Sequence, residues 1–264
     1  MFDQFQRVDA ISGWSFLVII VALLVAFEIG RHLARRRKAV KTARQLHAAN
    51  VLSGLLVLVS FLLAFSFGLA ADYFQQRRQV VLDEANAIGT TYLRSKYLPE
   101  PQSKKVARLM LAYVNLRIVE TSPEELAKAR TRSEALQGEL WKVASSLEDQ
   151  NPNSEFAGLF VASLNEMIDL HQTRVTTALD FRLPLVVLVT LYVVAFLTLL
   201  VMGYNAGLGG TGDAVLTVSA VLCIAVVLVL INDLNRPVQL TFEVSQQALI
   251  DVRDALEQDL GRHP

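Results

Sequence analysis

The chain has 264 residues, of which 53% are hydrophobic and 19% are charged. This apolar balance is unusual for a soluble domain and favours an integral membrane protein. The formal net charge is zero, so no nucleic-acid partner is expected, and the single cysteine, Cys223, excludes a disulfide within the chain.

A short N-terminal tail, residues 1–10, precedes an apolar stretch at 11–30 whose one ionisable side chain, Glu28, lies near its end. A helix rises ~1.5 Å per residue, so about 20 residues cross the ~30 Å hydrocarbon core of a bilayer. The stretch therefore predicts a first membrane span. Its positive charges follow the apolar run, which is not typical of a signal peptide. We expect Glu28 to pair with Arg31 or Arg35.

The loop at 31–50 concentrates positive charge and contains no acidic residue. Short basic loops remain in the cytoplasm, so this loop predicts the orientation of the spans. Contact with anionic lipid head groups is a second interpretation, compatible with the first. The residues concerned are Arg31, Arg35, Arg36, Arg37, Lys38, Lys41 and Arg44.

A second span is predicted at 51–71, where small residues recur every four positions beside two phenylalanines. Small residues at this spacing let helices pack closely in lipid, which is the commoner interpretation for a single helix. The alternative is a pore-lining face, in which rings of apolar side chains form a hydrophobic constriction. The candidates are Ser60, Phe61, Ala64, Phe65, Gly68 and Asp72.

Residues 72–182 have helical patterning throughout. The helix of the second span continues without a breaker until the prolines at 99–101, and Ser122 is the expected N-cap of a later helix. Another break is expected at 151–154. Helices joined by such short connections predict an antiparallel bundle inserted between the second and third spans.

Polar residues gather in this predicted bundle. We expect ion pairs and hydrogen bonds between its helices, and a ligand or ion site is the alternative. Asp169 stands where a helix-bundle metal motif requires histidine, so no metal and no cofactor are expected. Without a nucleophile motif or phosphate loop, catalysis is not expected either. The polar residues are Glu84, Asn86, Arg94, Asn165, Glu166, Asp169, His171 and Arg174.

Two further apolar stretches, 183–202 and 214–231, predict the third and fourth spans, with a glycine-rich turn at 203–213 between them. The tail, 232–264, ends in an amphipathic helix that packs on the bundle or on a neighbouring subunit. The fold class is thus an all-α membrane protein with four spans. With the basic loop in the cytoplasm, we expect a multi-pass protein of the bacterial inner membrane whose helical domain lies on the extracytoplasmic side.

Three segments resemble the bestrophin-like family of prokaryotic membrane proteins. They are "GLAADYFQQRRQVVLDEANAIGTTYLRSKYLPEP", "SLNEMIDLHQTR" followed by "RLP", and "INDLNRPVQLTFEVSQQAL". In the third segment Asp233, Arg236 and Pro237 match the family pattern, whereas Asn235 replaces an acid and Leu240 stands where glycine is usual. The resemblance covers about residues 20–250.

The resemblance implies kinship with bestrophins, which are pentameric anion channels whose second span lines a neck with apolar side chains. By that analogy Ser60, Phe61 and Phe65 are neck candidates. Bestrophins keep their helical domain in the cytosol, which conflicts with the orientation that the basic loop predicts. We favour the charge rule over the distant analogy.

These observations lead to a ring-like homo-oligomeric ion channel that contacts the lipid bilayer and conducts inorganic ions. The second span would line its pore, and the bundle would form a vestibule. The alternative is a non-conducting membrane sensor or scaffold whose bundle binds a ligand or a partner.

Overall fold

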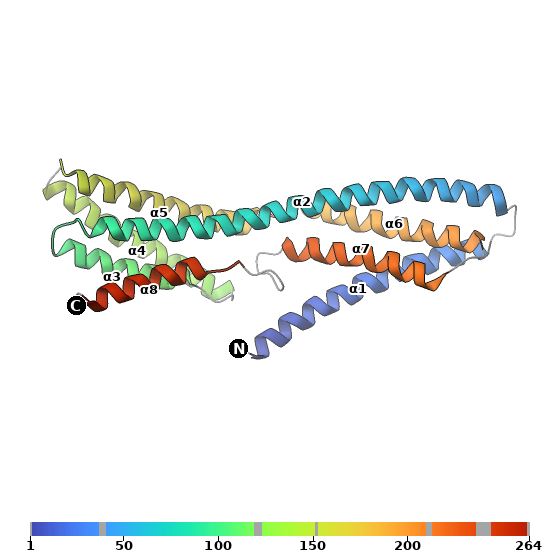
Figure 1. The fold of residues 1–264 in the computed structure, drawn as a ribbon, viewed down its shortest axis with the longest axis horizontal. Coiled ribbons are helices and arrows are strands. Elements are labelled where there is room, and N and C mark those ends of the chain that lie inside the picture. The colour runs from blue at the N-terminus through green and yellow to red at the C-terminus, as the bar shows by residue number, and fades with distance from the viewer. Residues whose placement is uncertain are drawn as a thin grey trace. The chain divides into compact units, whose positions relative to one another are not determined.

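The computed structural model describes residues 2–36, 41–118, 123–150, 153–209, 213–235 and 244–262. Within these ranges the chain forms eight helices and no strand, which confirms the all-helical expectation. Four of the described helices are long and apolar enough to cross a membrane, as predicted. Figure 1 shows the helices in chain order.

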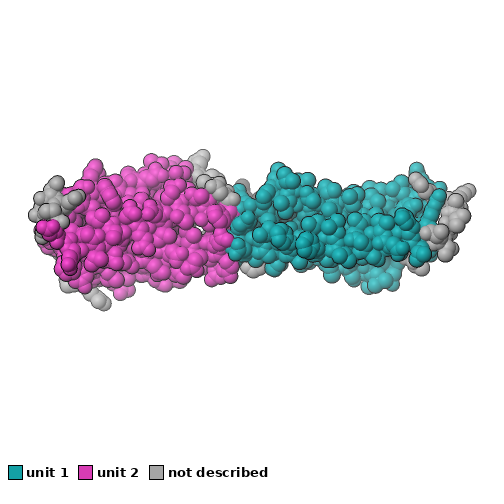
Figure 2. All heavy atoms as spheres, turned by 90° about the horizontal axis from the view of Figure 1, so that it is seen from above, with its two compact units in different colours: residues 1–74, 182–243 teal, residues 75–181, 244–264 magenta. Residues whose placement is uncertain are grey.

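The chain divides into two compact units, coloured separately in Figure 2. Unit 1 comprises residues 1–74 and 182–243, and unit 2 comprises residues 75–181 and 244–264. Helix α2 (Lys41–Ser95) contributes to both. It is unbroken over 55 residues and ends shortly before Pro99, as its sequence predicts.

Unit 1 contains α1 (Phe2–Arg35), the first part of α2, α6 (Leu185–Gly209) and α7 (Ala214–Leu234). Their side chains share one apolar core. The largest fully buried members of this core are Leu191, Leu199, Leu228 and Ile231. Because the candidate spans are helices, their backbone groups are satisfied within each segment, as a bilayer requires.

Glycines let α1 and α6 approach until their backbones touch. A Cβ atom on Gly30 would lie 1.9 Å from the Leu200 carbonyl oxygen, and one on Gly203 would lie 1.9 Å from the Phe27 carbonyl oxygen. On Gly207 a Cβ atom would meet the Cβ of Ala34 at 2.7 Å. Small residues four positions apart are a known means of close helix packing in lipid.

These contacts explain a difference from the sequence-based boundaries. The glycine-rich turn was expected at 203–213, but α6 continues to Gly209. Gly203 and Gly207 are packing residues of a helix rather than turn residues. Helix α7 begins after Asp213, whose side chain accepts a hydrogen bond from the Val215 N–H and so caps the helix.

The basic loop is shorter than expected because α1 extends to Arg35 and α2 begins at Lys41. The side chains of Arg35, Arg36 and Arg44 are exposed. Arg31 pairs with Glu28 at 2.6 Å, which confirms one of the two expected pairings. Two predicted loop residues, Arg37 and Lys38, lie outside the described residues, and so does the side chain of Lys41.

Unit 2 contains the second part of α2 with α3 (Gln102–Arg117), α4 (Pro123–Gln150), α5 (Glu155–Asp180) and α8 (Gln247–Arg262). Ser154 caps α5 by accepting from the Ala157 N–H. Ser122, the other expected cap, lies outside the described residues. The core includes Tyr113 and Phe160, which are fully buried.

The amphipathic tail helix packs within its own chain. Leu249 and Leu256 of α8 are buried in the core of unit 2. Asp259 of α8 accepts a hydrogen bond from the Tyr92 hydroxyl and pairs with Lys96 at 2.7 Å. Of the two alternatives for this helix, the structure therefore supports packing on the helices of unit 2.

We predict that Gly203→Ala destabilises the protein by about 1–3 kcal/mol, because the added methyl group overpacks a backbone contact. The measurement is the thermal midpoint of the purified protein in detergent. Gly54→Ala is the matched control, since a Cβ atom there meets nothing within 4 Å. An equal midpoint for both variants would contradict the close contact between α1 and α6.

Candidate functional site

The membrane portion of α2 has one face that packs in unit 1 and one that does not. Val59, Leu63, Ser66 and Ala70 are buried. The opposite side is exposed in the single chain, and it contains every pore-lining candidate. We call it the α2 outer face, and it consists of Ser60, Phe61, Ala64, Phe65, Gly68 and Asp72.

Two phenylalanines stand out on the α2 outer face. The rings of Phe61 and Phe65 are 65% and 56% exposed and stack one turn apart, with centroids 6.3 Å apart and an interplanar angle of 11°. At Gly68 a Cβ atom would meet nothing within 4 Å. The small residues of this face are thus not used for packing between the described helices of one chain, unlike the glycines of α6.

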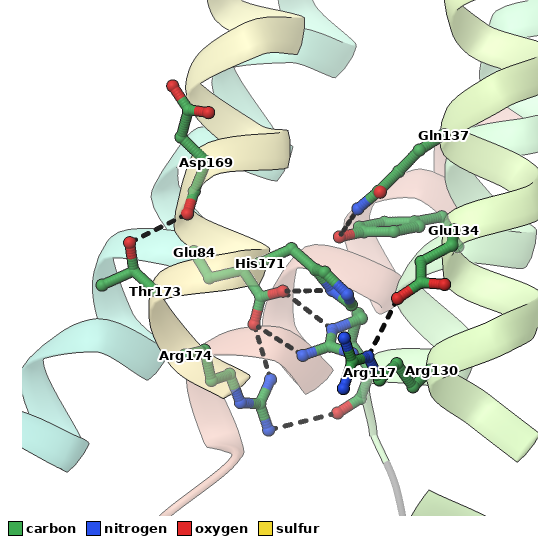
Figure 3. Close-up of polar contacts among 10 residues, drawn as sticks. Glu84, Arg117, Arg130, Glu134, Gln137, Asp169, His171, Thr173 and Arg174 are labelled. Atoms are coloured by element: carbon green, nitrogen blue, oxygen red, sulfur yellow. Dashed lines mark hydrogen bonds and ion pairs between the residues drawn. The ribbon is translucent and has the colours of Figure 1, made fainter. Parts of the chain in front are cut away.

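The second candidate site is a buried ion-pair cluster around Glu84, shown in Figure 3. The Glu84 carboxylate is fully buried. Its Oε1 accepts from Arg117 Nε at 2.7 Å, and its Oε2 accepts from Arg174 Nη1 at 2.6 Å. Arg174 Nη2 also donates to the Arg117 carbonyl oxygen at 3.4 Å. One carboxylate therefore joins α2, α3 and α5.

His171 lies beside this cluster without a hydrogen bond to it. Its Nδ1 is 3.8 Å from Glu84 Oε1, and within the described part of the chain neither ring nitrogen has a hydrogen-bond partner. Burial lowers the pKa of His171 to about 4, and the charge of Arg117 lowers it as well. The imidazole is consequently neutral at neutral pH and adds no third positive charge.

Tyr113 completes the apolar surroundings of the cluster. Its ring centroid lies 6.3 Å from that of His171, and its hydroxyl accepts a hydrogen bond from Gln137 of α4. Burial raises the pKa of Tyr113 well above its ordinary value, so the hydroxyl stays protonated. Burial likewise lowers the pKa of Arg174, and the Glu84 carboxylate opposes that shift.

Chemically, this arrangement is that of a structural cross-link. Both Glu84 oxygens are occupied by guanidinium groups, which are strong charge-assisted donors. Removing either partner of such a buried pair leaves an uncompensated charge. Among the described residues, no group of three or more histidine, cysteine or acidic side chains could hold a metal ion.

The expected polar network is only partly assembled. Glu84 and Arg174 pair as predicted. Arg94 instead donates to the Leu159 carbonyl oxygen, and Asn165 donates to Asp169 within α5.

The two remaining network residues, Asn86 and Glu166, are exposed and line a shallow surface groove between α2 and α5. They therefore lie on the surface of unit 2, outside the buried cluster. The groove is lined by Asp83, Asn86, Ala87, Thr90, Glu166 and Leu170.

Sequence reasoning missed Arg117, although the signal was present. Arg117 follows Met110, Tyr113 and Val114 at helical spacing, so it lies on the buried face of α3. An arginine on a buried face requires an acidic partner, which would have pointed to a buried carboxylate. The close-packing role of Gly203 and Gly207 was also readable from their four-residue spacing.

The third family segment contributes a local contact in unit 1. The Asn235 side-chain oxygen accepts a hydrogen bond from the Leu183 N–H, two residues before α6 begins. The amide at this position, where the family pattern has an acid, thus joins the end of α7 to the start of α6. Arg236, Pro237 and Leu240 lie outside the described residues.

Comparison with protein families identifies one match: a bestrophin-like domain over residues 14–249. The chain belongs to the bestrophin-like domain family. The match confirms the resemblance found in the sequence, and it covers most of both units of this bestrophin-like protein. Together with the four apolar helices, it indicates a membrane-embedded protein. Neither a curated protein nor a solved structure matches the chain.

We predict that Glu84→Gln destabilises the protein by about 3–5 kcal/mol, because it leaves two buried guanidinium groups without a carboxylate. The thermal midpoint in detergent measures the effect. Glu139→Gln is the control, since Glu139 pairs with Lys142 on the exposed surface of α4 and exposed pairs contribute little. A midpoint equal to that of the wild type for Glu84→Gln would show that the cluster is not a structural cross-link.

Proposed function

We propose that this bestrophin-like protein is a homo-oligomeric ion channel in which the α2 outer face lines the conduction path. The observation that carries the proposal is that this face is exposed in a single chain. It combines small residues with two stacked phenylalanines, a combination suited to contact with other subunits or with a pore. In this arrangement unit 2 is the helical bundle that forms a vestibule, with the second part of α2 as one of its helices.

The side-chain chemistry of the α2 outer face supports this role. A ridge of serine, alanine and glycine gives no advantage in contact with lipid chains. The same ridge lets a neighbouring helix approach closely, and it leaves space along a narrow pore. Rings of Phe61 and Phe65 around an axis would form a hydrophobic constriction of the kind that gates by dewetting. Ser60, Phe61, Ala64, Phe65 and Gly68 are all exposed, and a Cβ atom on Gly68 would meet nothing within 4 Å.

The competing hypothesis is a non-conducting sensor or scaffold. It is favoured by the unbroken course of α2, which runs from the apolar core of unit 1 to the buried Glu84 of unit 2 and would transmit a movement along the chain. It requires the small-residue ridge to be buried between spans of the same subunit. The exposure of Ser60, Ala64 and Gly68 argues against that arrangement.

For the orientation, we propose that the protein lies in the bacterial inner membrane with unit 2 outside the cytoplasm, because the loop between α1 and α2 is basic. Alkaline phosphatase, which is active only after export, tests this sidedness. We predict an inactive fusion when the enzyme is inserted after Ala39 and an active one when it is inserted after Glu120. The reverse pattern would contradict the proposed orientation.

We predict that the purified protein passes current in planar bilayers and that Phe65→Ala increases the open-state current at least about tenfold, or about 1.4 kcal/mol of barrier. The reason is that alanine removes a large apolar ring from the constriction. Phe67→Ala is the matched control, since Phe67 lies about 200° around α2 from Phe65 and outside the α2 outer face.

Equal currents for Phe65→Ala and Phe67→Ala would show that the α2 outer face does not line the pore. Absence of current from the wild-type protein under varied voltage, pH and salt would contradict the channel and favour the sensor. In both cases the oligomer is checked first by light scattering, so that a dissociated sample is not mistaken for a closed channel.

A further inference from the structure

The outward face of α5 is acidic. Glu155, Glu166 and Asp169 are exposed, and at 3.6 residues per turn they lie on one side of the helix. The one basic residue of α5 with a permanent charge, Arg174, instead turns inward to the buried Glu84. We call this surface the acidic α5 face.

The outward face of α3 has the opposite charge. Lys104, Lys105 and Arg108 are exposed, and α3 contains no acidic residue. The fourth basic residue of α3, Arg117, is buried against Glu84. We call the exposed surface the basic α3 face. The exposed charges of α3 and the exposed acidic residues of α5 are thus of opposite sign.

The two helices that carry these faces are separated by other helices of unit 2. Helix α4 contacts both α3 and α5. On the other side, α2 contacts both through Glu84, which binds Arg117 of α3 and Arg174 of α5. Helices α2 and α4 therefore lie between α3 and α5 in unit 2, and α8 packs against α3 as well.

Apolar side chains adjoin the acidic α5 face. The rings of Phe156 and Tyr97 stack with centroids 5.2 Å apart, and both are more than half exposed. Leu159, one turn along from Phe156, is also exposed. An exposed apolar patch bordered by charged side chains is typical of a protein interaction surface.

We infer that the acidic α5 face of one copy docks against the basic α3 face of a second copy of this chain. The occupant follows from charge complementarity, because the chain itself presents the surface that the acidic face requires. The contact is head-to-tail, so each copy uses two different faces, and repeating it produces a closed ring or a filament. This inference rests on the self-association that the proposed channel requires, and it adds the interface.

The proposed contact limits which helices of unit 2 can face the axis of a ring. If α3 and α5 make the contacts between copies, α2 and α4 of unit 2 lie on opposite sides of the row of subunits. In a closed ring, one of these two helices faces the axis. The exposed positions of α2 in unit 2 include Gln75, Arg78, Gln79, Leu82, Asn86 and Leu93.

Charge reversal tests the interface. The first variant carries Glu166→Lys and Asp169→Lys, the second carries Lys104→Glu and Arg108→Glu, and the third carries all four changes. We expect the wild type to be an oligomer in mild detergent at low salt, the first and second variants to be monomers, and the third to regain the oligomer. Light scattering during size-exclusion chromatography measures the mass.

Two matched controls carry the same charge changes on other exposed surfaces. They are Asp251→Lys with Glu257→Lys on α8, and Lys128→Glu with Arg132→Glu on α4. Both should remain oligomers. Dissociation of the controls, or no recovery in the third variant, would overturn the head-to-tail contact, as would a monomeric wild type.

The current measurement separates this inference from the channel proposal. An oligomer that conducts but ignores charge reversal contradicts the α5–α3 contact and leaves the channel standing. An oligomer that obeys the charge reversal but never conducts leaves the contact standing and contradicts the channel.

Discussion

A segment that crosses a bilayer has no water with which to satisfy its backbone N–H and C=O groups, so it must pair them internally. This requirement explains why the four apolar segments of this chain are helices. It also explains why α2 remains one helix over 55 residues: no proline interrupts it before Pro99, and helix propagation adds a hydrogen bond for each residue. Because α2 belongs to both compact units, its side chains must meet two different environments along one continuous backbone.

Each of the two units is stabilised internally by a different kind of interaction. In unit 1 the closest contact is made by glycine, where the backbones of α1 and α6 touch, because apolar side chains gain little from leaving lipid for a protein core. Unit 2 has a conventional apolar core, and the carboxylate of Glu84 lies in its interior. That carboxylate is tolerated because two guanidinium groups bind it, and the neutral His171 adds no further charge. Close backbone packing at glycines thus characterises unit 1, and an apolar core with a buried ion-pair cluster characterises unit 2.

Helix α2 passes through both units and has a buried side and an exposed side. Its buried positions run from Ala48 to Ser95, and exposed positions alternate with them as far as Leu93. A helix in a complete monomer usually has its small residues in contact with a neighbour, as α6 does here. The exposed ridge of Ser60, Ala64 and Gly68 is therefore the feature that argues most directly for a further subunit. The opposite charges of α3 and α5 are the basis of the contact that we propose for that subunit.

The number of spans, the helical class, the end of α2 near Pro99 and the pairing of Glu28 with Arg31 were readable from the sequence, because they depend on residues that are neighbours along the chain. The pairing of Glu84 with Arg174 was also anticipated, since both stand in predicted helices of the same domain. The partners of Arg117 and of Gly203 were not, because each lies far away in sequence: the buried Glu84 in one case and the backbone of α1 in the other. The small residues of α2 and those of α6 look alike as sequence patterns. Only the tertiary structure decides that Gly203 is packed and Gly68 is not, because the pattern specifies a face of a helix and the fold determines what lies against it.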